Sequence, residues 1–424
     1  MAEIISKRAE TVVDWKDFLN FYLAKCSNDS YNKENNPNGY INLGTAVNNL
    51  CTDLVYTKLS DVWTWEKSML QYEAGYGIVR LRKALAALVT EFFDPAEKIN
   101  PDNIFCAPGV TGCIDLIAHC LADPGDVFLA PTPCYARIFT DCKQRSLVDI
   151  WPIPIISRDN VELSPVLTIQ KVKKAYEDAL NHNKTVRGII LLNPSNPLGD
   201  VYKSELLMDI LEFFHLKDMH VVVDEVYALS VYHGGNQFHS VLKFPVLPDP
   251  KKVHVLYGMS KDFTVAGLRI GMVHTKCEVL QRCLTELCFL QCIPFPVMDM
   301  AARYLEDLEF CKKFVATNQD RLTARSATYA KRLTDMGLNV RKSNAAFFLW
   351  VDFRNICGSE SFRQERNFFE YLIEKFQLYI VPGEEFFCAQ PGWFRICFTA
   401  FPDDVDEGFN RLENAMKEYE RVKM

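Results

Sequence analysis

Short apolar runs alternate with helix-like segments between about residue 70 and residue 275 of this 424-residue chain. Such runs, bounded by turn residues, are typical of strands buried on both faces of a sheet. The predicted strands are Ile104–Ala107, Val127–Ala130, Gly188–Leu192, His220–Val223, Val253–Tyr257 and Ile270–His274. The predicted helices are Val79–Phe93, Thr111–Leu121, Thr168–Asn181, Ser204–Leu216 and Glu278–Leu290, the last with an alternative end beyond residue 300. This order predicts an α/β fold with a mostly parallel central sheet and helices on both faces.

The pattern changes after Pro294 and Pro296. A long charged helix, Ala302–Met336, is followed by the strand-like segments Ala346–Val351, Leu378–Ile380 and Trp393–Phe398, which indicates a smaller α+β domain. The first fifty residues are polar and are interrupted by the sequence Asn-Pro-Asn-Gly at 36–39, which is typical of a loop or arm. We therefore predict an N-terminal arm over 1–50, a large domain over 51–300 and a small C-terminal domain over 301–424.

Composition narrows the function. The formal charge of −7 and the absence of long basic runs give no electrostatic case for binding nucleic acid or an anionic membrane. Fifteen cysteines without a C-x-x-C pair predict reduced, mostly buried thiols, and eight histidines without an H-E-x-x-H motif argue against a metal site. No apolar signal segment or membrane-length run is present in this sequence, so we expect a cytoplasmic protein.

The first candidate for binding chemistry follows the strand Ile104–Ala107, where Pro108-Gly109-Val110-Thr111-Gly112 opens a predicted helix. In open α/β sheets, ligands bind beyond the carboxyl ends of the strands. The backbone N–H groups of Val110 and Thr111 and the threonine hydroxyl can bind an anion at such a helix start. The alternative is a glycine turn with a capping threonine.

Four further strands end in polar or aromatic residues that would meet at the same edge: Tyr135, Asn196, Asp224 with Tyr227, and Lys261. Each has a structural alternative: packing for Tyr135, an ordinary loop for Asn196, a helix cap or ion pair for Asp224, and a solvated lysine for Lys261. Together they match pyridoxal phosphate, which offers an aldehyde, a ring nitrogen, a phenolic oxygen and a phosphate. Lys261 would then be the amine that forms a Schiff base.

Seven motifs in order carry a resemblance from about Asn36 to Phe398: NPNGYINLGTAVNNL, PTPCYARIF, LLNPSNPLGDVY, VVVDEVY, MSKDFTVAGLRIG, FFLWVDF and EEFFCAQPGWFRICF. With them the chain resembles the fold-type I pyridoxal phosphate enzymes of the aminotransferase class. Within that class it is most similar to 1-aminocyclopropane-1-carboxylate synthase and its animal and fungal relatives.

The resemblance implies a role for each matching residue. Lys261 would hold the cofactor and then act as general base at the substrate Cα. Asp224 would keep the ring nitrogen protonated, Asn196 and Tyr227 would bind the phenolic oxygen, and Tyr135 would stack on the ring.

The resemblance also implies a phosphate site made of Val110, Thr111, Ser260 and Arg269. Tyr72 resembles the tyrosine that reaches a phosphate across the subunit boundary in this class, which predicts a homodimer with shared active sites.

For the substrate, the resemblance implies that Arg395, in Pro-Gly-Trp-Phe-Arg, grips the α-carboxylate in a bidentate pair, with Asn196 and Gly44 beside it. Arg80 and Arg137 lie near motif positions, and we interpret them as solvated surface residues, with substrate contact as the alternative.

Three departures from the family bear on the reaction. Val47 replaces a glutamate of the plant synthases, the sequence Gly-Tyr-Gly at 75–77 replaces Tyr-His-Gly, and Gly258 replaces a serine. Loss of that hydroxyl would weaken phosphate binding modestly. We expect an enzyme that deprotonates Cα of a small amino acid and then eliminates a group or closes a ring, acting on S-adenosylmethionine or a vinylglycine-like substrate. An aminotransferase, favoured by Val47, and a catalytically idle binding module are the alternatives.

Overall fold

The computed structural model describes residues 5–13, 15, 17–157 and 165–423, so parts of the predicted arm lie outside the described residues. The main sheet has seven strands in the order β2-β8-β7-β6-β5-β3-β4. Strands β4, β3, β5, β6 and β7 are parallel neighbours, whereas β8 runs antiparallel to β7 and β2. The strands are β2 Ile104–Pro108, β3 Val127–Thr132, β4 Asp149–Pro154, β5 Val186–Leu192, β6 His220–Asp224, β7 Val253–Gly258 and β8 Ile270–Thr275. The predicted α/β class with a mostly parallel sheet is confirmed.

Helices cover both faces of this sheet because successive strand residues point to opposite sides. In β5, Ile189 and Leu191 belong to the core under α7 and α8, whereas Ile190 and Leu192 belong to the core under α5, α6 and α10. The helices of the large domain are α3 Thr52–Val62, α4 Val79–Phe92, α5 Gly109–Leu121, α6 Arg137–Lys143, α7 Ile169–Asn181, α8 Ser204–Leu216, α9 Met259–Asp262, α10 Glu278–Leu287 and α11 Phe295–Glu306.

The register of the parallel strands places their carboxyl ends at one level. Leu192 of β5 pairs with Asp224 of β6, and Asp224 pairs with Leu256 of β7. The loops that follow β5, β6 and β7 therefore begin side by side, as the sequence pattern predicts. These loops carry Asn196, Tyr227 and Lys261.

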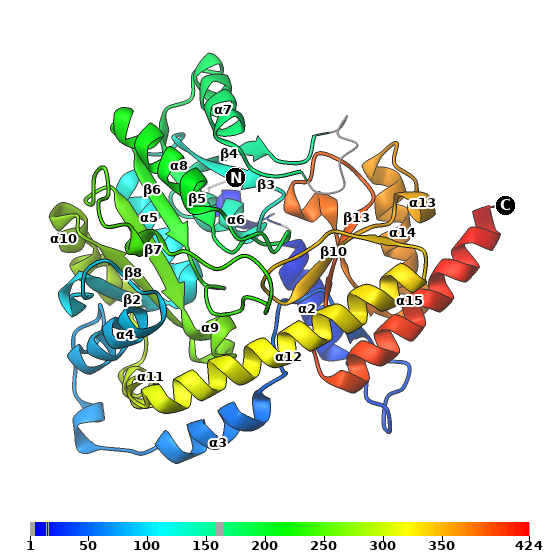
Figure 1. Ribbon diagram of the computed structural model, residues 1–424, viewed down its shortest axis with the longest axis horizontal. Coiled ribbons are helices and arrows are strands. Elements are labelled where there is room, and N and C mark those ends of the chain that lie inside the picture. The colour runs from blue at the N-terminus through cyan, green and yellow to red at the C-terminus, as the bar shows by residue number, and fades with distance from the viewer. Residues whose placement is uncertain (1–4, 14, 16, 158–164, 424) are drawn as a thin grey trace.

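The C-terminal part forms an antiparallel sheet in the order β12-β13-β10-β9, packed against helices. Its elements are β9 Asn339–Val340, β10 Phe348–Asp352, α13 Arg354–Cys357, α14 Phe362–Phe376, β11 Leu378–Tyr379, β12 Val381–Pro382, β13 Trp393–Cys397 and α15 Pro402–Lys423. Figure 1 shows helix α12, Leu308–Asp335, running from the large domain to this second part. Phe314 of α12 packs into the core beside α4 and α11, and Tyr329 packs into the core of the second sheet.

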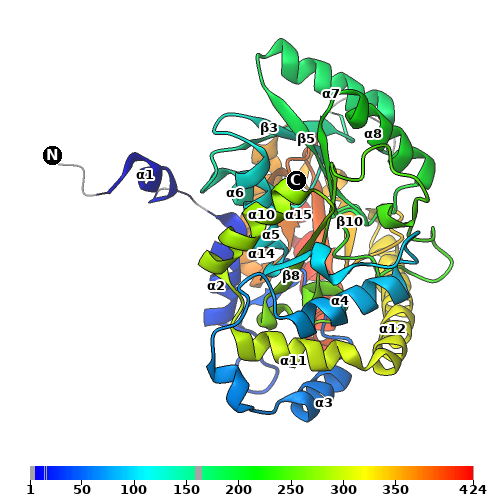
Figure 2. The same ribbon diagram turned by 90° about the vertical axis from the view of Figure 1, so that its left-hand side faces the viewer.

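The N-terminal arm attaches mainly to the small domain. Strand β1, Ile41–Asn42, pairs in parallel with β11, and α2, Phe18–Asn28, packs its ring of Phe18 against Phe369 at 5.2 Å. Helix α1, Lys7–Val13, has no buried residue and projects away from the body of the molecule (Figure 2).

Two helix boundaries correct the sequence predictions. The helix predicted over Ala302–Met336 is broken at Asp307, whose carboxylate caps α12 by accepting a hydrogen bond from Phe310 N at 3.0 Å. The alternative extension of the Glu278 helix past residue 300 is also wrong. After α10 the chain makes a 3-10 turn and bends by 116° into α11, because Pro294 and Pro296 stop the preceding helix.

The small-domain strands also differ from their predicted bounds. Strand β10 begins at Phe348 rather than at Ala346, whose φ of 71° is not extended. The predicted strand Leu378–Ile380 is shortened to β11, which ends at Tyr379, and Ile380 lies between β11 and β12. Strand β4 of the main sheet was missed, since its two prolines are untypical of a strand interior but are tolerated at a sheet edge.

All fifteen cysteines lie in the described part of the chain, where none forms a disulfide. Most of them are buried, as predicted. In the described ranges, no group of three or more histidine, cysteine or acidic side chains is arranged to hold a metal ion. No single described helix is long and apolar enough to cross a membrane, although α10 with its 3-10 turn and α11 pass that test as a bent pair, by length and composition only.

Candidate active site

A cavity of about 350 Å³ lies at the carboxyl edge of the large sheet, closed by the small domain and by α2. It contains every predicted site residue except Tyr72: Gly44, Val110, Thr111, Tyr135, Asn196, Asp224, Tyr227, Ser260, Lys261, Arg269 and Arg395. Residues from three separate parts of the chain thus meet in one place.

Lys261 lies on the short helix α9, directly after β7, and its side chain points into the cavity. Its Nζ donates a hydrogen bond to the backbone oxygen of Ala46 at 2.6 Å. Burial, and after it the charge of Arg395, lowers the pKa of Lys261 to about 8. The amine is therefore far more readily deprotonated than an ordinary lysine, as a nucleophile or base must be.

The next residue, Asp262, fixes the lysine-bearing turn. Its buried carboxylate accepts hydrogen bonds from Leu229 N at 2.9 Å, Ser230 Oγ at 2.6 Å and Tyr257 Oη at 3.3 Å. These bonds tie α9 to the loop after β6. Sequence analysis gave Asp262 no role, since its partners are more than thirty positions away in two of the three cases.

Asp224 ends β6 and is buried with one oxygen accepting a hydrogen bond from Val226 N at 3.1 Å. Burial raises the pKa of Asp224 to about 7, against the opposing effects of the Val226 N–H and the Lys261 amine. A buried carboxylate that faces a cavity fits a cationic ring nitrogen, which would return its pKa to the acidic range.

Arg395 is the clearest sign that a ligand is needed. Only 2% of it is exposed, and it donates from Nη1 to Asn196 Oδ1 at 2.9 Å and from Nη2 to the backbone oxygen of Gly44. Its Nε is buried with no hydrogen-bond partner among the described residues. The ionisable groups that influence its charge are tyrosines and a cysteine rather than carboxylates. A buried guanidinium in this state fits the carboxylate of a bound amino acid.

Aromatic rings position this guanidinium. It lies 5.0 Å from the ring centroid of Phe348 and 4.7 Å from that of Phe386. Gly44 must be a glycine, because a Cβ there would overlap the ring of Tyr379. The Gly44 backbone can therefore approach closely enough to accept the arginine.

The candidate phosphate site lies at the start of α5. Gly109, with φ of 74°, turns the chain into the helix and leaves the N–H groups of Val110 and Thr111 facing the cavity. The guanidinium of Arg269 is held at this helix start by its hydrogen bond to Pro108 O at 3.2 Å. A helix start with an adjacent arginine fits the phosphate of the cofactor.

Two of the three departures from the family, Gly258 and Val47, have clear positions relative to the cavity. Gly258 has no room for a side chain, because a Cβ there would lie 2.7 Å from Ile270 O and 3.2 Å from Val110 Cγ2. Val47 is not among the residues that line the cavity, although its neighbours Thr45 and Ala46 are.

Arg137 corrects our interpretation of it as a solvated surface residue. It lines the cavity, its side chain is 19% exposed, and it forms ion pairs with Asp17 and with Asp141, the latter at 2.8 Å. Arg80 is a surface residue as predicted, paired with Glu306 at 2.6 Å.

Sequence analysis missed the contribution of α2, whose residues Leu19, Asn20 and Leu23 also line the cavity. Tyr72, by contrast, is 91% exposed and does not reach the cavity of its own chain.

The chain is similar in sequence to proteins of one known family. Residues 41–412 match the family model for aminotransferase class I and II. The chain is 31% identical to 1-aminocyclopropane-1-carboxylate synthase 2 of Cucurbita pepo, over 93% of this chain and 82% of that protein. It is also 31% identical to a mouse (Mus musculus) protein named probable inactive 1-aminocyclopropane-1-carboxylate synthase-like protein 2, over 93% of this chain and 68% of that one.

Solved structures agree on the fold. Aspartate aminotransferase from Thermus thermophilus superposes with a TM-score of 0.76 at 18% identity, covering 97% of this chain and 100% of that one. Aromatic aminotransferase from Pyrococcus horikoshii gives a TM-score of 0.75 at 21% identity, covering 92% and 97%. The chain therefore belongs to the class I and II aminotransferase family, a family of pyridoxal phosphate-dependent enzymes, with 1-aminocyclopropane-1-carboxylate synthases and synthase-like proteins among its relatives.

Proposed function

We propose that this protein is an active pyridoxal phosphate enzyme that removes the Cα proton of a small amino acid. The observation that carries the proposal is the combination, in one cavity, of a lysine with a lowered pKa, a buried carboxylate and a buried arginine that is paired with no carboxylate of the described residues. These three groups match an aldehyde, a ring nitrogen and a substrate carboxylate.

When bound, pyridoxal phosphate draws electrons from the substrate Cα and makes its proton acidic. Asp224 would keep the ring nitrogen charged, Asn196 and Tyr227 would bind the phenolic oxygen, and Tyr135 would cover one ring face. The phosphate would be held by Val110, Thr111, Ser260 and Arg269.

Lys261 would then act as the base at Cα, since its burial favours the neutral amine. Arg395 would fix the substrate α-carboxylate and so orient the Cα–H bond toward the lysine. The small domain and α2 close the cavity from the other side and limit the access of water.

The reaction that we favour is elimination or ring closure, as the names of the synthase relatives suggest, on S-adenosylmethionine or a vinylglycine-like amino acid. The second candidate is amino transfer to a 2-oxo acid, and one observation favours it. Among the described residues that line the cavity, Asp224 is the one carboxylate. Lys261 would therefore be the one general acid and base at the substrate. A catalytically idle protein is disfavoured because Lys261, Asp224 and Arg395 are all retained.

The proposal includes a homodimer. Large apolar side chains are exposed in two segments, before Gly75 and around Phe289, and the two segments meet where Gly75 lies against Phe289. The exposed members are Trp63, Trp65, Leu70, Tyr72, Phe289 and Leu290. Such a patch is typical of a subunit interface and would place Tyr72 near a second copy. Cytoplasmic location and the absence of nucleic-acid and membrane partners stay predictions.

Borohydride trapping tests the proposal. We expect reduction of the purified protein to attach the cofactor to the peptide that contains Lys261, as read by mass mapping. The Lys261→Ala variant should carry no label, whereas Lys276→Ala, which removes an exposed lysine paired with Glu97, should be labelled normally. A label on another lysine, or none, would contradict the proposal.

Products then separate the reactions. Incubation with S-adenosylmethionine should release methylthioadenosine if the protein is a synthase, and incubation with vinylglycine should release ammonia if it is a lyase. A new amino acid formed from a 2-oxo acid would identify an aminotransferase.

A further inference from the structure

Helix α2 has an inner face that attaches it to the small domain. Phe18, Tyr22 and Cys26 follow one another at four-residue intervals and lie on one side of the helix. Tyr22 stacks on Tyr379 with ring centroids 5.3 Å apart, and Cys26 is buried. The helix is therefore fixed in rotation, which determines where its other side chains point.

A second apolar row of α2 faces the active-site cavity. Leu19 and Leu23, again four residues apart, both line the cavity that holds Lys261 and Arg395. Leu23 is 40% exposed, so part of its apolar side chain is in contact with solvent. Covering that surface with an apolar group would be favourable.

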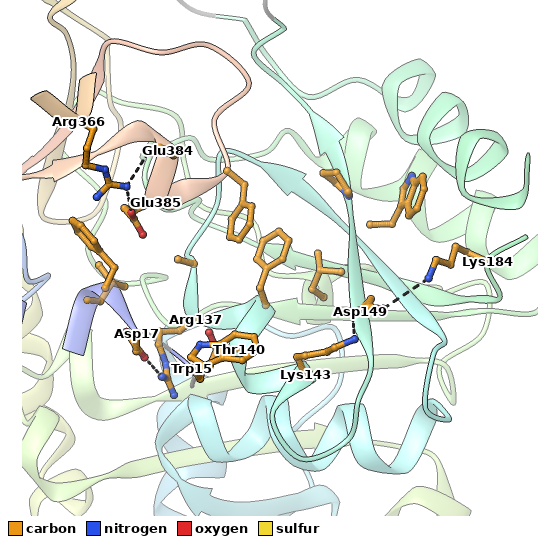
Figure 3. A pocket seen from close by; sticks show the side chains of 18 residues that line it. Trp15, Asp17, Arg137, Thr140, Lys143, Asp149, Lys184, Arg366, Glu384 and Glu385 are labelled. Atoms are coloured by element: carbon orange, nitrogen blue, oxygen red, sulfur yellow. Dashed lines mark hydrogen bonds and ion pairs between the residues drawn. The ribbon is translucent and has the colours of Figure 1, made fainter. Parts of the chain in front are cut away.

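The start of α2 is attached to the large domain. Asp17 caps the helix by accepting a hydrogen bond from Asn20 N at 3.0 Å, and Arg137 of α6 forms an ion pair with the same carboxylate. Figure 3 shows this pair beside Trp15 and Thr140, in a larger outer cleft of about 920 Å³. Leu19 and Arg137 line both spaces, so they form the wall between the active-site cavity and the outer cleft.

The positive charge of Arg137 is already paired with two carboxylates of the protein. Its Nη1 donates to Asp17 and its Nη2 donates to Asp141 at 2.8 Å. A distal carboxylate on a substrate would meet a guanidinium that is already paired with two carboxylates, and it would face two leucines. An acidic side chain would therefore lose its hydration without gaining a partner.

We propose that Leu19 and Leu23 form the subsite for the substrate side chain, and that the enzyme prefers amino acids with an uncharged apolar side chain over dicarboxylic ones. The inference rests on the proposed function, since the lysine and arginine at the base of the cavity must hold the amino acid first. Of the two proposed kinds of substrate, it favours vinylglycine-like and longer aliphatic amino acids over S-adenosylmethionine, whose side chain carries a sulfonium charge.

Titration of the holoenzyme tests this subsite. The change in visible absorption of the bound cofactor gives dissociation constants for alanine, norvaline, methionine and glutamate, and thermal unfolding gives an independent shift for each. We expect norvaline to bind about tenfold or more tightly than alanine and glutamate, which is the discrimination that one or two methylene groups allow.

Variants assign the preference to α2. The double variant Leu19→Ala with Leu23→Ala should bring the norvaline-to-alanine affinity ratio close to 1, and Leu23→Met should keep it. Leu23→Lys should raise the affinity for glutamate relative to norvaline. Leu216→Ala, at an 81% exposed position on α8, is the matched control and should change no ratio.

Failure of the proposed function and failure of the subsite give different results. If the wild-type enzyme gives no spectral change with any amino acid, the proposed function fails and the subsite with it. If amino acids bind but the ratios are the same in wild type and double variant, the subsite alone is wrong. Dissociation of the protein into monomers in the double variant, with unchanged ratios, would assign the leucines to a subunit contact and overturn the inference.

Discussion

The two walls of the cavity are built in different ways. The large-domain wall carries Asp224 and Lys261 at the ends of adjacent strands, in positions fixed by the ladder of the sheet. The opposite wall joins distant segments, since Arg395 donates to Gly44, 351 positions earlier in the chain, and α2 comes from the arm.

The walls also differ in how far their polar groups are satisfied without a ligand. Asp262 of the large-domain wall accepts three hydrogen bonds, so that the lysine turn is held by the protein alone. Arg395 of the other wall has a buried Nε without a partner in the described chain. A buried charge in this state is costly until an anion arrives. The first wall is therefore preformed, and the second would be completed by an anion such as the carboxylate of the proposed amino acid substrate.

The largest effect that separates the walls is expected for Arg395→Met. Loss of the guanidinium should weaken amino acid binding by about 2–5 kcal/mol, or about 30- to 5,000-fold, because the substrate carboxylate loses its buried partner. Titration of the holoenzyme measures this. Cofactor content should stay the same, and the substrate-free protein should be no less stable to denaturant, since an unmatched buried charge is removed.

The surface variant Arg80→Met is the control, because Arg80 forms exposed ion pairs away from the cavity. Loss of cofactor from Arg395→Met would show that the two walls are not independent.

The same contrast explains what the sequence could predict. Asp224, Tyr227 and Lys261 follow apolar runs directly, and the ends of parallel strands share one edge, so their meeting follows from local pattern and a general rule. The role of Arg395 could be predicted only from a family motif, because the residues around it in the sequence do not indicate that strand β13 faces that edge.

The contribution of α2 could not be predicted from the sequence. The orientation of its two apolar rows depends on the packing of Tyr22 against Tyr379, and Arg137 is paired with Asp17, which lies 120 positions before it. Such contacts between distant segments leave no periodic signal. For the same reason the break at Asp307 was missed, because a single capping side chain decides it.

On the large-domain wall we expect an effect of intermediate size, which is the pH dependence of the rate at which Lys261 reacts with pyridoxal phosphate. Burial lowers the pKa of Lys261 from 10.5 to about 8, so the fraction of neutral amine falls tenfold per pH unit below about 8. Only the neutral amine attacks the aldehyde, so the rate at which cofactor-free protein takes up pyridoxal phosphate should rise about 50-fold from pH 6 to pH 8 and level off above about pH 9. Absorbance of the bound cofactor measures the rate.

This experiment also connects the walls. Arg395 is the second cause of the lowered lysine pKa, so in Arg395→Met the levelling should move to higher pH. A wild-type rate that still climbs tenfold per unit above pH 9 would mean that the lysine has an ordinary pKa.

The smallest effect concerns Gly258, where the family has a serine. Restoring the hydroxyl by Gly258→Ser should not strengthen phosphate binding but should destabilise the protein by about 1–3 kcal/mol, because the new Cβ would lie 2.7 Å from Ile270 O. Denaturant unfolding measures the loss. Gly267→Ser is the matched control, since a Cβ at that exposed glycine meets nothing within 4 Å. If Gly258→Ser left the stability unchanged and bound the cofactor more tightly, the large-domain wall would have room to adjust to a new side chain. The two walls would then differ less in rigidity than we infer. A destabilised variant would instead show that β7, β8 and the start of α5 are packed too closely for the missing hydroxyl to be replaced.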